Sequence, residues 1–392
     1  MTPSRPFLRR LSPVFLLPCV CLIGEPGSAP DPQAVPDRTE GGFAVPQPGH
    51  PFQFPEDHGS HPAFAIEWWY ITGHLFAGED RRFGFQATFF RNAGPPDSAA
   101  GGDPTFRADQ LFLAHMALFD VQKQTFYHQE RLARMGWNAD AAEGRLDIFT
   151  GPWSLRAKDY QPEGDPETME LVGGTNGEMR FTLSLRPEKG RTLFGIDGWS
   201  RKGPELTASS YYITFTRLSV DGTVNLPGEN LTVTGFAWMD HEISSNQLGD
   251  NQVGWDWTAI HLHDGTEIMA YRLRRKDGST DPYSFFNWVA ADGTVTTVNA
   301  DAFTWQGGGD WTSPNTGGTY PIAPTLTATH PETGLTETYR LEPLGRDLEL
   351  AGTLGGIAYW EGPCRVRNAE GAVIGDAFLE LTGYAQDLGD RL

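Results

Sequence analysis

Residues 67–75 read EWWYITGHL, and residues 254–262 read GWDWTAIHL. When they are aligned at a constant offset, four positions correspond: Trp68 with Trp255, Tyr70 with Trp257, His74 with His261 and Leu75 with Leu262. Aromatic residues two positions apart share one face of a β-strand. The two stretches therefore predict two copies of one β-rich unit. If the aromatic face points inward, both copies have an aromatic-lined interior.

The sequence around these stretches has the pattern of short β-strands from Phe64 onward. Apolar and β-branched runs of this kind occupy residues 83–90, 111–120, 181–185, 211–216 and 231–238. Asp-Gly pairs, which are typical of hairpin turns, follow at 221–222, 264–265, 277–278 and 292–293. Because sustained helical periodicity is almost absent, we predict an all-β, up-and-down antiparallel fold.

The length of 392 residues corresponds to about two domains. Hydrophobic residues make up 39% of the chain, which is enough for real cores and argues against wholesale disorder. We expect the boundary near the loop 221–229. This gives an N-terminal domain over residues 61–228 and a C-terminal domain over residues 229–392.

The first residues have the features of an export signal. Arg5, Arg9 and Arg10 precede an apolar segment over residues 11–23, which is too short to span a bilayer and fits a secretory leader. Small residues favour cleavage after Ala29, so we expect residues 1–29 to be a signal peptide and the protein to be periplasmic or secreted. Lipidation of Cys19 or Cys21 is the alternative. Residues 30–60 are rich in Pro and Gly and predict a linker, and no later segment is long and apolar enough to cross a membrane.

The net charge of −20 argues against nucleic-acid binding, because a negative surface repels phosphates and no basic stripe compensates. Only Cys364 lies in the expected mature chain, so an internal disulfide is excluded there. We expect Cys364 to be a small buried hydrophobe.

The triplet Asp240, His241 and Glu242 is the sharpest candidate for chemistry. A histidine oriented by a carboxylate can donate or accept a proton near neutral pH. On a regular strand His241 faces away from the two carboxylates, whereas a bulge or strand end brings all three together. A structural role, with Asp240 capping a turn, is the alternative. The neighbours that favour a reactive site are Trp238, Trp255, Trp257 and Tyr271, because aromatic walls desolvate an acid and stabilise a cation.

A second cluster contains Glu67 with Trp68, Tyr70 and His74. The last three are candidate ligand-binding residues, whereas for Glu67 we favour a hydrogen bond or an ion pair with an Arg. His115 lies in an apolar run typical of core histidines. His261 and His263 share a face but lack a third ligand, so we predict no metal site. We also predict no cofactor. Sequence motifs of nucleotide-binding proteins, serine hydrolases and zinc peptidases are absent.

The chain resembles the family of secreted AttH-like proteins and carotenoid 1,2-hydratases (hydroxyneurosporene synthases), often labelled predicted secreted hydrolases. The resemblance rests on residues 67–75, 235–242, 254–257, 359–362 and 380–384 and covers the chain from about Phe64. It implies two consecutive lipocalin-like (calycin-type) antiparallel barrels. For the hydratase branch it also implies cofactor-free addition of water, in which acids protonate an alkene and aromatic residues stabilise the carbocation.

The hydratase pattern is incomplete in this sequence. His241 matches the functional His of that branch and Tyr271 its Tyr, but Ile243 and Leu273 stand where a Trp and an Asp are expected. The chain is more similar to the AttH-like branch, whose members accompany ABC transporters of the lipoprotein-export type.

Three hypotheses follow from these residues. In the first, the protein hydrates or hydrolyses an apolar isoprenoid or lipid, with His241 as the acid/base, oriented by Asp240 or Glu242. In the second, it is a non-catalytic periplasmic carrier or chaperone for such a ligand beside an ABC transporter. The third is a sugar ligand on the aromatic faces.

Overall fold

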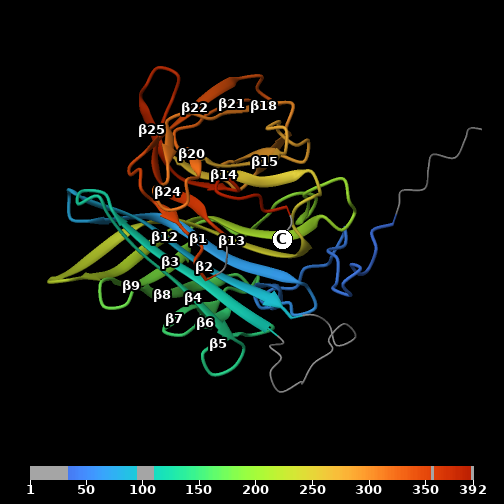
Figure 1. The fold of residues 1–392 in the computed structure, drawn as a ribbon, viewed down its shortest axis with the longest axis horizontal. Coiled ribbons are helices and arrows are strands. Elements are labelled where there is room, and N and C mark those ends of the chain that lie inside the picture. The colour runs from blue at the N-terminus through green and yellow to red at the C-terminus, as the bar shows by residue number, and fades with distance from the viewer. Residues whose placement is uncertain (1–33, 95–109, 355–356, 390–392) are drawn as a thin grey trace, which may run out of the picture. The chain divides into compact units, whose positions relative to one another are not determined.

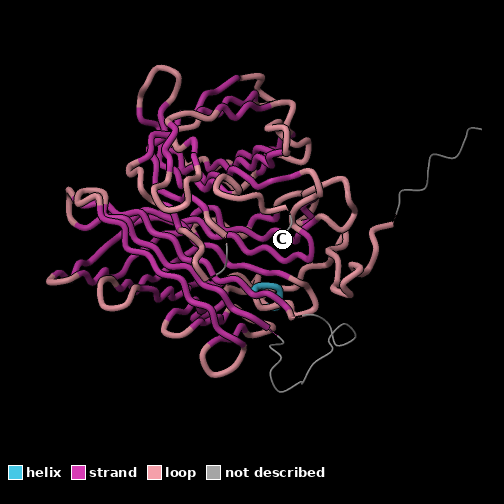
Figure 2. The backbone as a smooth tube through the Cα atoms, viewed as in Figure 1, coloured by secondary structure: helices cyan, strands magenta, loops and turns pink. Residues whose placement is uncertain are grey.

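The computed structural model describes residues 34–94, 110–354 and 357–389. The expected signal peptide, with Cys19, Cys21 and the cleavage position at Ala29, lies outside these residues. One 3-10 turn, η1 (Glu56–His58), is the only helical element of the described chain, and everything else regular is β-strand (Figure 2). Within the same ranges, no helix has the length and hydropathy needed to cross a membrane.

The first sheet has 13 strands and is almost closed into a barrel (Figure 1). Along the main path its order is β4-β3-β2-β1-β13-β12-β9-β8-β7-β6-β5, and β10 and β11 also pair with β12. The end strands β4 and β5 are consecutive in the chain, which brings the two sheet edges near each other. The strands are β1 (Ile66–Ala77), β2 (Arg81–Ala93), β3 (Gln110–Asp120), β4 (Thr125–Arg134), β5 (Ala139–Ala141), β6 (Asp147–Thr150), β7 (Trp153–Tyr160), β8 (Pro166–Gly174), β9 (Arg180–Pro187), β10 (Thr192–Leu193), β11 (Trp199–Arg201), β12 (Ser209–Leu226) and β13 (Glu229–Asn246).

The second sheet has 10 strands and curls in the same way. Its order is β17-β16-β15-β14-β25-β24-β22-β21-β18, with β23 on β24, and its end strands β17 and β18 are again consecutive in the chain. The strands are β14 (Gln252–Leu262), β15 (Glu267–Arg275), β16 (Phe285–Val289), β17 (Val295–Asn299), β18 (Phe303–Gln306), β21 (Thr325–Thr329), β22 (Thr336–Pro343), β23 (Glu349–Leu350), β24 (Tyr359–Arg367) and β25 (Val373–Thr382); β19 (Asp310–Thr312) and β20 (Thr319–Pro321) form a separate pair. The predicted all-β fold of two consecutive lipocalin-like antiparallel barrels is confirmed.

The chain passes from the first barrel to the second between Asn246 and Gln252, later than the boundary expected at residues 228–229. The reason is that β12 and β13 form one long hairpin, and β13 also pairs with β1, so β13 completes the first barrel. Residues 45–60, part of the expected linker over residues 30–60, pack instead on the first barrel, as does Phe64 of the expected N-terminal domain. Phe52, Phe54 and Phe64 contact a buried cluster of Tyr211, Ile213 and Ile243.

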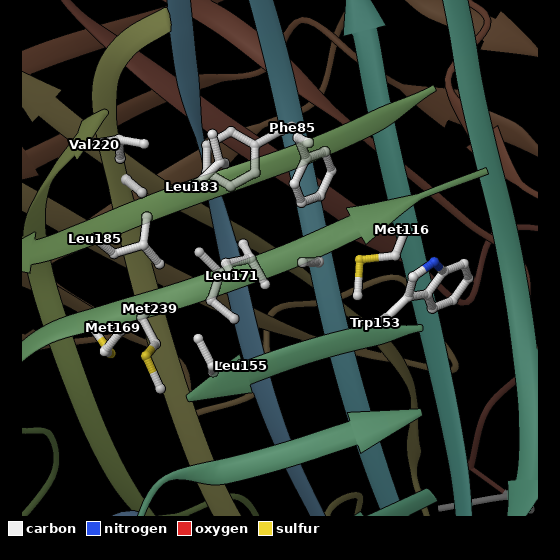
Figure 3. Close-up of a cluster of buried hydrophobic side chains, with 14 of the residues drawn as sticks. Phe85, Met116, Trp153, Leu155, Met169, Leu171, Leu183, Leu185, Val220 and Met239 are labelled. Atoms are coloured by element: carbon white, nitrogen blue, oxygen red, sulfur yellow. The ribbon is translucent and has the colours of Figure 1, made fainter. Parts of the chain in front are cut away.

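Strands β1 and β13 are buried on both faces because the two barrels, both within Val35–Leu392, pack against each other. Their odd-numbered residues, such as Trp69 and Met239, fill the interior of the first barrel, part of which Figure 3 shows. Their even-numbered residues, such as Tyr70 and Trp238, face the second barrel and pack with its Trp257 and Tyr271. The aromatic face that the sequence placed conditionally inside each barrel therefore points outward, into the contact between the barrels.

A substitution at Gly84 in β2 would test the contact between the two barrels. A methyl group added at Gly84 would lie 2.4 Å from Cγ of Pro363 in β24, and the proline ring cannot rotate away. We expect Gly84→Ala to lower the free energy of unfolding by about 1–3 kcal/mol, the usual cost of overpacking. Urea denaturation would measure this loss. Gly190→Ala is the control, because the nearest atom to its new methyl group is 3.8 Å away; equal stability of the two variants would contradict the close approach of the barrels.

Candidate active site between the barrels

A pocket lies where the outer faces of the two barrels meet. Its empty volume, counted out to the open mouth, is about 750 Å3. The first barrel contributes Ile66, Trp68, Tyr70, Thr88, Phe90, Tyr212, Asp240 and Glu242. The connection between the barrels contributes Gln247, and the second barrel contributes Trp255, Trp257, Tyr271, Ile357, Tyr359, Glu380 and Thr382.

Aromatic rings form most of the apolar wall of this pocket. Tyr70 and Trp257 meet edge to face across the two barrels, with ring centroids 5.3 Å apart. Trp68 lies beside Phe90, and Tyr271 packs on Phe285. Such walls exclude water from an apolar ligand and present π-faces that attract positive charge.

Asp240 is a buried carboxyl group at the floor of the pocket. Its Oδ1 accepts hydrogen bonds from Thr214 Oγ1 and Trp238 Nε1, both at 2.7 Å, and its Oδ2 accepts one from the Tyr212 hydroxyl at 2.8 Å. Burial raises the pKa of Asp240, and although these three hydrogen bonds oppose the rise, the pKa stands at about 7. Asp240 can therefore gain or lose a proton near neutrality.

Glu242, two residues further along β13, forms an ion pair. Lys202 Nζ lies 2.9 Å from Glu242 Oε2, and Ser210 Oγ donates to the same oxygen at 2.5 Å. Lys202 is fully buried, and its Nζ also lies 4.7 Å from the ring centroids of Tyr212 and Tyr271. The pair holds Glu242 as a charged acceptor in a pocket that is otherwise poor in charge.

Glu361 and Glu380 form a carboxyl pair on the second barrel. They are direct cross-strand partners on β24 and β25, and the Tyr70 hydroxyl donates to Glu361 Oε1. Burial raises the pKa of Glu361 well above its usual value, and the neighbouring Glu380 raises it further. Burial also raises the pKa of Glu380, against a hydrogen bond from Trp255, to about 8. The raised pKa values favour the protonated form of both side chains at neutral pH, and Glu380 lines the pocket.

A separate polar cluster surrounds Glu67 on the opposite face of β1 and β13. Glu67 Oε1 accepts hydrogen bonds from His61 Nδ1 and His241 Nε2, both at 2.9 Å, and Glu67 Oε2 lies 2.9 Å from Arg91 Nε. Burial alone would raise the pKa of Glu67, but the two histidines outweigh it and hold the pKa well below the usual value. Burial lowers the pKa of His241 to about 4, so this ring is neutral and donates its Nε2 proton.

The structure brings most of the predicted site residues together. The seven that line the pocket are Asp240, Glu242, Tyr271, Trp68, Tyr70, Trp255 and Trp257. Trp238 lies behind Asp240 as a hydrogen-bond donor rather than in the wall. His74 lies at the contact between the barrels, where its Nε2 donates to the Ala377 carbonyl at 3.0 Å and its Nδ1 accepts from Arg82.

His241 differs most from its expected place. Because β13 is a regular strand at this point, alternation directs His241 away from Asp240 and Glu242, and Glu67 orients it instead. Its ring stacks on Trp69, with centroids 4.6 Å apart and planes at 18°. The expected orientation by Asp240 or Glu242 is therefore wrong, and His241 does not line the pocket.

The two departures from the hydratase pattern have different structural consequences. Ile243 faces the same side as His241 and packs under the N-terminal segment, away from the pocket. Leu273 packs with Tyr271 and Trp257 at the contact between the barrels, so an apolar side chain stands there in place of the carboxylate of the hydratase branch.

Four polar residues of the site were missed by the sequence analysis: Glu361, Glu380, Tyr212 and Lys202. Glu361 follows Trp360, and Glu380 lies between Leu379 and Leu381; a carboxyl group beside apolar strand residues is a usable signal in retrospect. Lys202 follows β11, and no sequence signal marked it as a site residue.

His261 is buried on the Thr216 carbonyl and His263 is exposed, so they do not form a pair. His115 is buried against the Tyr359 hydroxyl, and Cys364 is a buried free thiol, as expected.

The fold and the pocket define a two-barrel, lipocalin-like protein with a ligand site between its barrels. The AttH-like family model matches residues 45–384, and the chain belongs to this family. No curated protein sequence matches the chain significantly.

Solved structures share the architecture. The crystal structure of the AttH protein NE1406 from Nitrosomonas europaea is 33% identical, with a TM-score of 0.76, and the match covers 87% of this chain and 100% of that one. Kievitone hydratase from Nectria haematococca is 14% identical, with a TM-score of 0.63 and coverage of 86% and 93%. CghA with Sch210972 is 12% identical, with a TM-score of 0.54 and coverage of 89% and 98%. At these low identities the last two show a common fold.

The Lys202–Glu242 pair yields a stability prediction. Lys202→Met leaves the Glu242 carboxylate buried without its partner, so we expect it to lower the free energy of unfolding by about 3–5 kcal/mol. The double variant Lys202→Met/Glu242→Gln removes both charges and should recover much of that loss. Urea denaturation of both variants and of Glu242→Gln would give the coupling energy; additive effects would show that the two side chains do not interact.

Proposed function

We propose that this AttH-like protein is an enzyme that adds water to an apolar ligand in the pocket between the barrels, by acid–base catalysis without a cofactor. The observation that carries the proposal is that two carboxyl groups, one from each barrel, line the same aromatic pocket. Glu380 is a partly buried acid whose pKa is raised to about 8, and Glu242 is ion-paired with Lys202.

The chemistry of hydration needs both groups. The Glu380 hydroxyl would donate its proton to one carbon of a carbon–carbon double bond, leaving a cation on the other carbon. The faces of Trp68, Trp257 and Tyr271 would stabilise that cation. A water molecule then forms the new carbon–oxygen bond as it gives a proton to Glu242, and solvent returns that proton to Glu380. The net reaction is alkene plus water to alcohol.

The wall of the pocket supports an isoprenoid or another lipid as the ligand. Most of the lining is aromatic or aliphatic, and the neutral polar groups at Thr88, Gln247 and Thr382 are few enough to orient one functional group of the ligand. The common fold with kievitone hydratase is compatible with such a reaction, although fold alone does not determine function.

Tyr212, Trp238 and Thr214 would support the site through Asp240. Their three hydrogen bonds fix the Asp240 carboxyl beside Glu242, and its pKa of about 7 allows it to relay a proton during turnover. In this proposal His241 acts from the other face of β13 and positions the strand rather than touching the ligand.

The test is turnover in oxygen-18 water with acyclic isoprenoids of increasing length and with envelope lipid extracts, read by mass spectrometry. We expect products that gain one labelled water. Glu380→Gln should lower kcat/KM by about 100-fold or more, because general acids contribute about 10²–10⁴-fold. The matched control, Glu370→Gln on the exposed surface, should retain full activity. Products cleaved by labelled water would indicate a hydrolase. Binding without any label would contradict the enzyme proposal and favour a carrier.

The acid form of Glu380 also sets a pH dependence. Because the pKa of Glu380 is raised to about 8, the proton is present below that pH and lost above it. We therefore expect kcat/KM to fall as the pH rises through about 8. An activity that instead rises through this range would exclude Glu380 as the proton donor.

A further inference from the structure

The Glu67 cluster contains three side chains that are arranged as metal ligands. His61, Glu67 and His241 each offer one ligand atom, and these atoms all lie within 4.8 Å of one another. Two imidazole nitrogens, His61 Nδ1 and His241 Nε2, approach the same oxygen, Glu67 Oε1, at 2.9 Å each. The three residues come from distant parts of the chain: His61 from the segment after η1, Glu67 from the start of β1 and His241 from the middle of β13.

Neighbouring groups hold each of the three side chains in place. His61 Nε2 lies 2.9 Å from Asp57 Oδ1, and such a carboxylate behind a histidine commonly fixes the ring of a metal ligand. The His241 ring is held flat on Trp69.

The second oxygen of Glu67 is fully engaged. Glu67 Oε2 accepts hydrogen bonds from the His61 backbone N–H, Ser60 Oγ and Arg91 Nε. These partners leave Oε1 directed at the two imidazoles.

We propose that His61, Glu67 and His241 bind one divalent transition-metal ion of the zinc type. Two imidazoles and one carboxylate suit Zn²⁺ and chemically similar ions, whereas Mg²⁺ and Ca²⁺ prefer all-oxygen sites. Asp57 and Glu67 supply two negative charges, against one positive charge on Arg91. Three protein ligands leave a fourth position for water, and the partly exposed His61 side chain provides the route of entry.

The proposed site is separate from the pocket. Glu67 and His241 face the interior side of β1 and β13, whereas Asp240 and Glu242 face the second barrel. A metal ion here would tie residues 57–61 to both strands behind the pocket. The inference therefore stands independently of the proposed hydration, and it did not follow from the sequence, where His241 lies 174 positions after Glu67.

The test measures metal content in the purified protein. After treatment with a chelator and dialysis against Zn²⁺, we expect one zinc ion per chain by elemental mass spectrometry, and a melting temperature that rises with zinc concentration. His61→Gln should weaken zinc binding by at least the roughly 10–100-fold that loss of a supporting partner costs. The control, His263→Gln, removes an exposed histidine and should bind zinc normally, as should Glu380→Gln in the pocket.

A second measurement needs no variant. With Co²⁺ in place of Zn²⁺, the unmodified protein should show visible d–d absorption, and X-ray absorption should show imidazole scattering from two histidines. Unmodified protein that stays free of zinc, or His61→Gln that binds as much zinc as the unmodified chain, would overturn the proposal. In that case the three side chains are held together only by hydrogen bonds, with a proton on His61.

Discussion

The burial of single strands on both faces is the constraint on which the rest of the structure depends. In most antiparallel sheets one face meets water, and polar residues alternate with apolar ones. Here β1 and β13 fill their own barrel with one face and pack on the other barrel with the opposite face. A charged group on either face is cut off from solvent, so it must be ion-paired, hydrogen-bonded or protonated.

The carboxyl groups at these faces are stabilised in different ways. Glu242 has the Lys202 ammonium, Asp240 has three hydrogen-bond donors, and Glu361 and Glu380 retain their protons. Glu67 on the other face is surrounded by donors that favour its ionised form. The same β13 strand thus separates a side on which the pKa values of Asp240, Glu361 and Glu380 are raised from a side on which the pKa of Glu67 is lowered.

The all-β fold and its duplication could be predicted from the sequence, because hairpin turns and strand alternation are local features. The pair Trp68 and Tyr70 was correctly placed on one face with its counterparts Trp255 and Trp257. The local sequence does not determine which way that face points, because the direction depends on whether a second barrel covers the face. Asp240 and Glu242 were identified as candidates, whereas Glu380, which reaches the pocket from the last strand, and its partner Glu361 were not. His241 was assigned to the wrong partners because its partner, Glu67, lies far away in the chain.

The pairing of β1 with β13 also governs when this protein can fold. Ile66 is the register partner of Ser244, so the first strand of the first barrel lacks one of its two neighbours until almost two thirds of the chain has emerged from the ribosome. Long-range pairing of this kind slows folding and prolongs the exposure of apolar strands. Strands β1 and β2 can pair with each other early, but the edge of β1 that receives β13 stays open during this period, and such an open apolar edge is prone to aggregation.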